Sequence, residues 1–388
     1  MRILICPLDW GLGHATRCIP LIRAFRSAGH EVMVYASGAG YRLLRAEFPG
    51  LQIGRLPGYA MRYSRHRFLL PFWLLLQLPL FLLSAVADRF RAASLARRHD
   101  ADLVISDGRY GFRTVRAPCV FITHQLCLLP PLPRKAREGM LPWLTALNRL
   151  ALRGFAQIWV PDFQGHRNLS GRLGHPALPW RNVRYAGPLC RFRSENSSWA
   201  SPAEMESTGQ RLDVLALVSG PEPQRSLFEQ ALLAALDTMS GTRVLVRGLP
   251  GEGKAVPREV APGTLAVFDH LPEPALLSML AGADKVVCRS GYTTVMELAG
   301  LGKKNILVVP TPGQPEQEYL AVHLRELGLA HFQAQENLAL AEGLEKAGEL
   351  AGFASLYHGE KEERGRRSLA DFLSGNPLIR QGQSRPVL

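Results

Sequence analysis

This sequence of 388 residues has few cysteines, and none of them are spaced as in metal-binding or redox motifs. Its six cysteines form no CxxC pair and several stand inside apolar runs, which argues against a disulfide framework and against a cysteine metal site. The opening run MRILICPLDWG is not expected to be a signal peptide, because its apolar part is short and leads into aspartate and glycine. We therefore expect a cytoplasmic protein with buried, reduced thiols and no bound metal.

Low-complexity tracts are also missing, and acidic residues are the minority among the charged ones. Apolar residues make up 47% of the chain, which is typical of globular proteins and not of disordered ones. Lys and Arg number 46 against 33 Asp and Glu, so the surface should attract nucleic acid, anionic lipid headgroups or phosphorylated small molecules. Charge alone does not choose among these three. The length favours two domains.

Strand-like and helix-like patterns alternate along the whole chain, which predicts an α/β protein. RILICPL and HEVMVYAS are runs typical of buried strands, and a helix pattern over residues 14–27 separates them. Such a βαβ unit builds a parallel sheet that holds ligands at the carboxyl ends of its strands. Further strands are expected at DLVISD, CVFITH, IWVPD, VRYAGP, LDVLALVSG, TRVLVRG, LAVFDH, KVVCRSG and NILVVPTP.

A change of composition divides the chain. Residues 189–211 are polar and predict a linker. Residues 1–188 and 212–360 then form two Rossmann-like domains whose parallel sheets face a cleft. Residues 361–388 are expected to form a C-terminal helix and tail.

The stretch LDWGLGHATR leaves the first predicted strand and enters the first predicted helix. Gly11 and Gly13 allow a tight turn there, and a neutral His14 at the helix start can accept a proton from a hydroxyl. The alternative is a glycine turn with a capping histidine. The stretch lacks the third glycine of a dinucleotide fingerprint, so an NAD site is disfavoured. Two polar residues that end first-half strands are further candidates for this site: Asp107 and His124.

Two loops of the second half carry polar groups after predicted strands. In LVSGPEPQR, backbone amides at Ser219 and Gly220 are suited to a diphosphate, and Arg225 adds positive charge. The loop PTPGQPEQEY is shaped by proline and glycine. Its side chains are suited to sugar hydroxyls: Gln314, Glu316, Gln317 and Glu318.

A third loop joins a strand to a helix at CRSGYTTVMELAG. Backbone donors at Ser290 and Gly291, together with Arg289, are suited to a phosphate or to the polar edge of a nucleoside. Glu297, about two helical turns further on, can accept hydrogen bonds from both hydroxyls of a ribose. The alternative for each of the three loops is an ordinary strand-to-helix connection.

Several motifs of this chain resemble those of one family of enzymes. The sequence is similar to GT-B-fold glycosyltransferases close to glycosyltransferase family 28, which includes the N-acetylglucosaminyltransferase that forms lipid II. It is more similar still to a poorly characterised bacterial and archaeal group of predicted glycosyltransferases. The motifs that carry the resemblance are DWGLGHATR, SDGRYGF, ITHQL, SGPEPQR and PGQPEQEYLA.

The resemblance implies that the first domain binds the acceptor and the second domain binds a nucleotide sugar. It implies these contacts: Glu297 with the ribose, the backbone near Phe268 with the base, Ser219 and Gly220 with the diphosphate, and Gln317 and Glu318 with the transferred sugar. The chain departs from the family where DWGLGH replaces GGTGGH, where SGPEPQ replaces GGSQG, and where Gln-Glu replaces Gln-Gln.

The implied reaction is a single displacement with inversion at the anomeric carbon. A hexosyl group passes from a nucleotide-diphosphate sugar, a UDP-sugar by preference, to an acceptor hydroxyl. His14 or Asp9 takes the proton, while helix amides and Arg225 or Arg289 stabilise the departing nucleoside diphosphate without a metal. Two alternatives stay open, a nucleotide-sugar epimerase of the same fold and a non-catalytic nucleotide-sugar-binding protein.

One long apolar run is present, at residues 68–87, and only Gln77 and Ser84 interrupt it. Its length matches a bilayer core, but arginines flank both ends and Pro79 disfavours a straight helix. We expect an in-plane insert at an anionic membrane, with a buried helix and a true membrane span as alternatives. The protein would then be peripheral at the inner face of the cytoplasmic membrane, with a lipid-linked acceptor among the options and no nucleic-acid partner.

Overall fold

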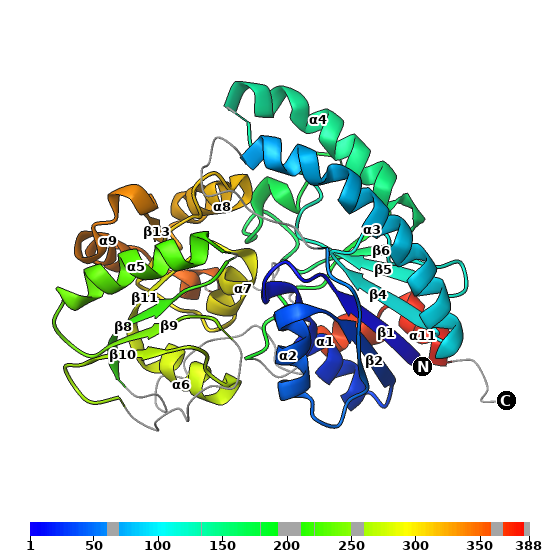
Figure 1. Cartoon of the computed structure of the whole chain (residues 1–388), viewed down its shortest axis with the longest axis horizontal. Coiled ribbons are helices and arrows are strands. Elements are labelled where there is room, and N and C mark those ends of the chain that lie inside the picture. Colours follow the sequence, from blue (N-terminus) through cyan, green and yellow to red (C-terminus); the bar gives the residue numbers. More distant parts are fainter. Residues whose placement is uncertain are drawn as a thin grey trace. The chain divides into compact units, whose positions relative to one another are not determined.

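The structure is a computed structural model that describes residues 1–59, 70–132, 134–178, 180–192, 211–220, 222–249, 260–357 and 368–383. Its contacts divide the chain into two compact units. The first comprises Met1–Arg62, Pro71–Ser198 and Glu362–Leu388, and the second comprises Tyr63–Leu70 and Trp199–Lys361. Each unit is an α/β layer structure in its own right (Figure 1).

The first unit contains a seven-stranded sheet with strand order β3-β2-β1-β4-β5-β6-β7, and every neighbouring pair is parallel. The strands are β1 (Arg2–Pro7), β2 (Glu31–Ala36), β3 (Ile53–Arg55), β4 (Leu103–Asp107), β5 (Cys119–Ile122), β6 (Gln157–Val160) and β7 (Val183–Tyr185). The helices are α1 (Gly13–Ser27), α2 (Gly38–Glu47), α3 (Leu70–Arg98), α4 (Arg134–Ala151), α10 (Leu369–Ser374) and α11 (Pro377–Gln383), with short 3₁₀ turns η2 (Leu152–Gly154) and η3 (Gly171–Leu173).

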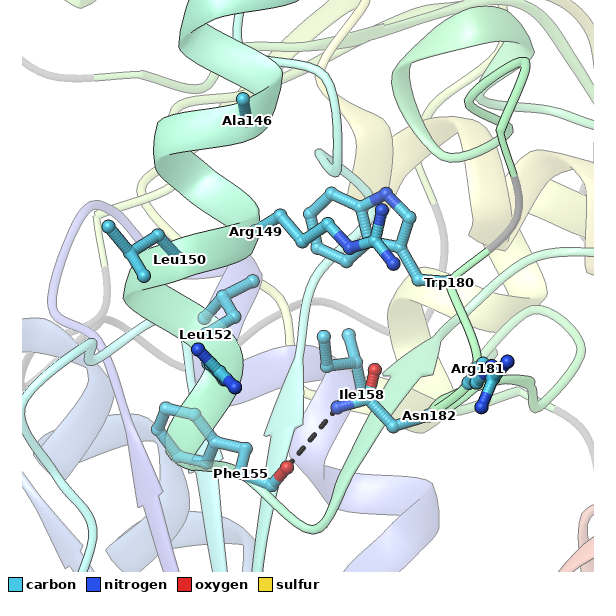
Figure 2. A pocket seen from close by; sticks show the side chains of 10 residues that line it. Ala146, Arg149, Leu150, Leu152, Phe155, Ile158, Trp180, Arg181 and Asn182 are labelled. Atoms are coloured by element: carbon cyan, nitrogen blue, oxygen red, sulfur yellow. Dashed lines mark hydrogen bonds between the residues drawn. The ribbon is translucent and has the colours of Figure 1, made fainter.

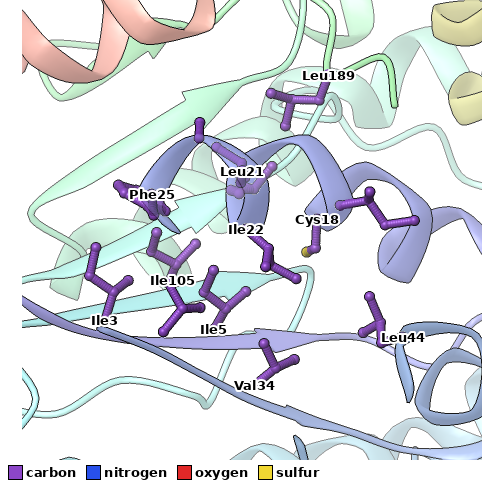
Figure 3. Close-up of a cluster of buried hydrophobic side chains, with 14 of the residues drawn as sticks. Ile3, Ile5, Cys18, Leu21, Ile22, Phe25, Val34, Leu44, Ile105 and Leu189 are labelled. Carbon is purple, nitrogen blue, oxygen red and sulfur yellow. The ribbon is translucent and has the colours of Figure 1, made fainter. Parts of the chain in front are cut away.

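Alternate residues of these strands bury the two faces of the sheet in two separate cores. Ile3 and Ile5 of β1 pack with α1, α2, α10 and α11, and all of their side-chain surface is buried (Figure 3). Leu4 and Cys6 point to the other face, where α3 and η2 cover them. Each fully buried aliphatic side chain of this kind contributes about 1.5–3 kcal/mol to the free energy of unfolding.

The second unit contains a six-stranded parallel sheet with strand order β10-β9-β8-β11-β12-β13. The strands are β8 (Leu212–Leu217), β9 (Arg243–Val246), β10 (Leu265–Phe268), β11 (Ala283–Cys288), β12 (Ile306–Val308) and β13 (His331–Phe332). The helices are α5 (Gln224–Asp237), α6 (Glu273–Gly282), α7 (Tyr292–Gly300), α8 (Pro315–Glu326) and α9 (Leu340–Gly348), with 3₁₀ turns η4 (Gln335–Asn337) and η5 (Phe353–Tyr357).

The prediction of two parallel-sheet α/β domains is confirmed. Every expected strand is present, whereas β3 and β13 were not expected, because their residues, IGR and HF, form no apolar run. The C-terminal helices return to the first unit, where Asn376 Nδ2 donates to Gln157 Oε1 at 2.8 Å. Residues 193–210 of the predicted linker lie outside the described residues.

The long apolar run forms most of α3, a helix of 29 residues. Among the helices in the described parts of the chain, none has both the length and the apolar character that a bilayer crossing requires. Residues 68 and 69, the first two of the predicted insert, lie outside the described residues. All six cysteines are buried, as expected.

Candidate active site

The centre of the first sheet is the point where its strand order reverses. From β1 the chain builds outward to β2 and β3, and from β4 it builds outward in the opposite direction. Pro7 of β1 pairs with Asp107 of β4, so these two strands end at the same level. The connections that follow diverge to opposite sides, which is where open α/β sheets bind their ligands.

Four polar side chains meet at this point. His14 Nδ1 lies 3.0 Å from Asp107 Oδ1, and Arg17 Nε donates to Asp107 Oδ2 at 2.6 Å. Arg17 Nη2 also donates to Asp107 Oδ1, and its Nη1 lies 3.3 Å from His124 Nδ1. Asp107 is fully buried, and His14 keeps 19% of its side chain exposed. The structure therefore brings together one predicted catalytic residue, His14, and both strand-end candidates.

Nδ1 of His14 faces two partners, the Asp107 carboxylate at 3.0 Å and the Arg17 Nη2 donor at 2.8 Å. Burial alone raises the pKa of Asp107, but Arg17 and His14 hold it at about 2, so Asp107 is ionised and accepts hydrogen bonds only. With the proton on Nδ1, toward Asp107, His14 has a lone pair on Nε2; with the proton on Nε2, Nδ1 accepts the N–H of Arg17 Nη2. Burial and the Arg17 charge lower the pKa of His14, against the effect of Asp107. A neutral imidazole held in this way can act as a general base.

Gly108 directly follows Asp107 and packs against the His14 ring. Its φ is +76°, and a Cβ atom there would lie 2.7 Å from His14 Cε1. Gly108→Ala should therefore strain the backbone and displace His14, and we expect turnover to fall about 10- to 100-fold. Gly29→Ala is the matched control, because Gly29 has φ +77° but nothing within 4 Å of the added Cβ. Equal initial rates for the two variants would contradict this role of Gly108.

Asp9, the other predicted base, contacts a backbone loop. Its Oδ1 accepts the N–H of Tyr59 at 3.0 Å, and a Cβ on Gly58 would lie 1.8 Å from its Oδ2. Asp9 thus anchors residues 58–59 beside β1. Its role in proton transfer stays a prediction.

In the second unit, the three predicted loops follow β8, β11 and β12, which are neighbours in the sheet. Gln317 of α8 joins two of them: its Oε1 accepts the N–H of Thr311 at 2.8 Å, and its main-chain oxygen accepts Ser290 Oγ at 2.8 Å. Its Nε2 is the atom nearest to a Cβ built on Gly291, at 4.0 Å. The structure therefore brings Ser290, Gly291 and Gln317 together.

Arg289 lies in the same region, but its guanidinium donates hydrogen bonds to other groups of the protein. It is fully buried, and its Nη1 donates to the main-chain oxygens of Val309 and Pro310, both at 3.1 Å. Its Nη2 donates to Gln224 O at 3.0 Å and to Gln335 Oε1 at 2.6 Å. Burial lowers the pKa of Arg289 to about 9, against the charge of Glu336. Arg289 thus braces the loop after β12 against the start of α5, and a phosphate contact stays a prediction.

Arg225 also binds groups of the protein, in this case two glutamates. Its Nε donates to Glu222 Oε1 at 2.6 Å and its Nη1 to Glu229 Oε2 at 2.7 Å. Gly220, before this helix, has φ +110°, and no described atom lies within 4 Å of a Cβ built there. Ser219 is half-buried beside it.

The other residues predicted to bind the nucleotide sugar lie on β10, on α7 and at the start of α8. Glu297 is buried on α7, and Phe268 ends β10, where its main-chain oxygen accepts the N–H of Arg247 at 2.8 Å. Gln314 precedes α8 as its N-cap residue. Glu318 Oε1 accepts the N–H of Gly313 at 3.0 Å and so closes the loop before α8. Nothing in these contacts assigns a ligand to Phe268 or Gln314.

Among the described residues, no group of three His, Cys, Asp or Glu side chains lies close enough together to hold a metal ion. The chain does contain one D-x-D sequence, Asp100 to Asp102. Asp102 Oδ2 accepts the N–H of Arg2 at 2.7 Å, and Asp100 forms an exposed ion pair with Arg2. Both aspartates stand before β4, at the edge of the sheet opposite to Asp107.

Comparison with known proteins finds similarity to glycosyltransferases. Residues 272–366 match the glycosyltransferase family 28 C-terminal domain. An uncharacterized glycosyltransferase of Methanosarcina acetivorans is 26% identical over 348 residues, which cover 84% of this chain and 82% of that protein. The Desulforudis audaxviator UDP-N-acetylglucosamine–N-acetylmuramyl-(pentapeptide) pyrophosphoryl-undecaprenol N-acetylglucosamine transferase is 40% identical over 99 residues, 25% of this chain and 24% of that one.

Among solved structures, the glycotransferase of kitacinnamycin superposes with a TM-score of 0.62 at 18% identity, covering 96% of this chain and 98% of that one. The two parallel-sheet domains define the GT-B fold of glycosyltransferases. The second unit carries a family 28 C-terminal domain, and the chain is a glycosyltransferase of this kind.

Sequence reasoning missed Arg17, which links Asp107, His14 and His124. The available signal was its spacing, since residues three apart on a helix share a face and Arg17 follows His14 by three. It also missed Thr311 and Gln335, because their partners are distant in sequence.

Proposed function

We propose that this protein transfers a hexosyl group from a UDP-sugar to an acceptor hydroxyl, with inversion at the anomeric carbon. The observation that carries the proposal is the His14–Asp107 pair at the switch point of the first sheet. The choice of UDP is supported by the name of the Desulforudis relative, whose matched region is 40% identical.

The first unit deprotonates the acceptor in this proposal. His14 Nε2 takes the proton of the acceptor hydroxyl as its oxygen bonds to the anomeric carbon, and the bond from that carbon to the diphosphate breaks. Asp107 orients the ring and stabilises the imidazolium that forms, while Arg17 keeps Asp107 ionised. The proton thus ends on His14, and the electron pair of the broken bond leaves with the nucleoside diphosphate.

The second unit holds the donor in this proposal. The backbone at Ser219 and Gly220 and the start of α7 at Gly291 supply amides for the diphosphate, so that its charge needs no metal. Arg289 acts through the loops that it braces. Gln317 Nε2 and Glu318 face the transferred sugar, and Glu297 accepts the ribose hydroxyls.

Replacement of Glu297 tests the donor site. Glu297→Ala removes the expected acceptor of two ribose hydrogen bonds, so affinity for the UDP-sugar should fall by about 1.5–3 kcal/mol. Thermal shift with a panel of UDP, dTDP and GDP sugars measures this loss and identifies the donor. Glu326→Ala, on the last turn of α8, is a control that should bind like the parent. Unchanged affinity in Glu297→Ala would contradict the assignment of the donor site.

We further propose that α3 holds the protein on the surface of an anionic membrane, where a lipid-linked acceptor is accessible. Large apolar side chains of α3 are exposed to solvent, and they include Leu76, Leu80, Leu82, Leu83, Val86 and Phe90. A helix that exposes this much apolar surface beside arginines is typical of interfacial binding. This placement is peripheral and does not require the chain to cross the bilayer.

A further inference from the structure

A hollow of about 610 Å³ lies at the edge of the first sheet opposite to the candidate active site. Phe155 and Asn182 line it, and they precede β6 and β7, whereas Asp107 ends its strand. Figure 2 shows the end of α4 on one side of the hollow, and Trp180 with Arg181 and Asn182 on the other. Asn182 Nδ2 donates to Phe155 O at 3.2 Å and closes its floor.

The charge of this hollow has one sign. Arg149, Arg153 and Arg181 line it, and its described lining residues include no acidic one. Arg149 Cζ lies 6.0 Å from the centre of the Trp180 ring (Figure 2). An adjoining hollow, again with no acidic residue among its described lining residues, shares Arg153 and adds two more arginines: Arg89 and Arg113. Burial and the nearby Arg89 charge lower the pKa of Arg113. A cluster of guanidinium groups without a carboxylate favours a phosphate.

The surroundings of the two hollows are apolar. Leu150 lines both of them and is 63% exposed, and Val115 in the second is 95% exposed. The outer face of α4 continues this surface with three further exposed residues: Met140, Trp143 and Leu147. A free phosphate requires the arginines alone, whereas a phospholipid also requires apolar surface beside them for its acyl chains.

We infer that the hollow between α4, β6 and β7 binds the headgroup phosphate of an anionic phospholipid, with the exposed face of α4 lying against the acyl chains. This inference rests on the proposed membrane association, to which it adds a second helix and a defined headgroup site. It does not depend on the donor or on His14. A site of this kind would also orient the first unit on the membrane, because α3 and α4 then contact one surface.

The test is the paired variant Arg149→Gln with Arg181→Gln, measured by co-sedimentation with vesicles. Both side chains are exposed, so the fold should be unaffected. We expect affinity for phosphatidylglycerol vesicles to fall about 25-fold, about fivefold for each arginine. The control pair, Arg26→Gln with Arg45→Gln, removes the same charge from exposed positions on α1 and α2 that line neither hollow and should change affinity less than about threefold.

A soluble lipid separates a headgroup site from general attraction to a charged surface. Monomeric dihexanoyl phosphatidylglycerol should raise the melting temperature of the parent and not that of the Arg149/Arg181 variant. Equal vesicle affinity of the two variant pairs would overturn the hollow as a site while leaving the membrane proposal in place. Equal stabilisation of the parent by inorganic phosphate would overturn the lipid as its ligand. Absence of vesicle binding by the parent would overturn both.

Discussion

Turnover should fall about 10²- to 10⁴-fold when His14 is replaced by alanine, while affinity for the nucleotide sugar stays near that of the parent. The expectation follows from the position of His14, whose Nδ1 lies 3.0 Å from Asp107 and whose Nε2 is the proton acceptor in the proposed mechanism. His14 acts when the acceptor hydroxyl loses its proton, so its replacement should not change the affinity for the nucleotide sugar. Release of nucleoside diphosphate measures the rate, and calorimetry measures donor affinity.

The pH profile provides the control for this prediction. A general base must be neutral, and burial together with the Arg17 charge lowers the pKa of His14 below its usual 6.5. The rate of the parent should therefore decline only as the pH falls below 6.5. Asp107→Asn removes the charge that raises this pKa, so its acid limb should move to lower pH while its rate also falls. An unaltered rate in His14→Ala would transfer the role of base to Asp9 or to another residue.

Replacement of Arg109 by methionine should cost about 3–5 kcal/mol of stability in the first unit. Arg109 is fully buried, and its Nε and Nη2 donate to Asp88 Oδ2 and Oδ1 at 2.8 and 2.7 Å. Tyr59 Oη donates to the same carboxylate at 2.8 Å. Without Arg109, Asp88 is left as a buried carboxylate with most of its compensating charge removed. Hydrogen exchange of the β4 amides measures the loss in this unit alone.

The double variant Asp88→Leu with Arg109→Met is the control, because it removes both charges. Replacing both members of a buried ion pair by apolar groups is often close to neutral, so the double variant should regain at least about 1–2 kcal/mol relative to Arg109→Met. A single variant that costs less than about 1 kcal/mol would show that the pair contributes little. His14→Ala, which truncates a side chain that is 19% exposed, should leave exchange at β4 nearly unchanged.

Local pattern was sufficient for most of the fold. The β-branched runs and the helix period between them predicted the strands β1, β2, β4 to β12 and the two parallel sheets, because burial imposes these periods on neighbouring residues. Gly11 at φ +71° and the start of α1 at Gly13 follow from the same kind of local constraint. The family motifs likewise lie in short, continuous stretches, and they indicated a glycosyltransferase before any distance was known.

Contacts between residues far apart in sequence required the tertiary structure. Asp107 and Arg17 are 90 residues apart, and only the pairing of β1 with β4 brings them together. Arg289 looked like a phosphate ligand by its place after a strand, yet the fold surrounds its guanidinium with main-chain oxygens. The arginines of the hollow come from α4, η2 and the turn before β7, separate segments that no sequence period connects. Sequence by itself determined which elements form and which loops carry polar groups, since both depend on neighbours along the chain. The tertiary structure alone decided which of those groups meet, because the order of strands in a sheet sets that.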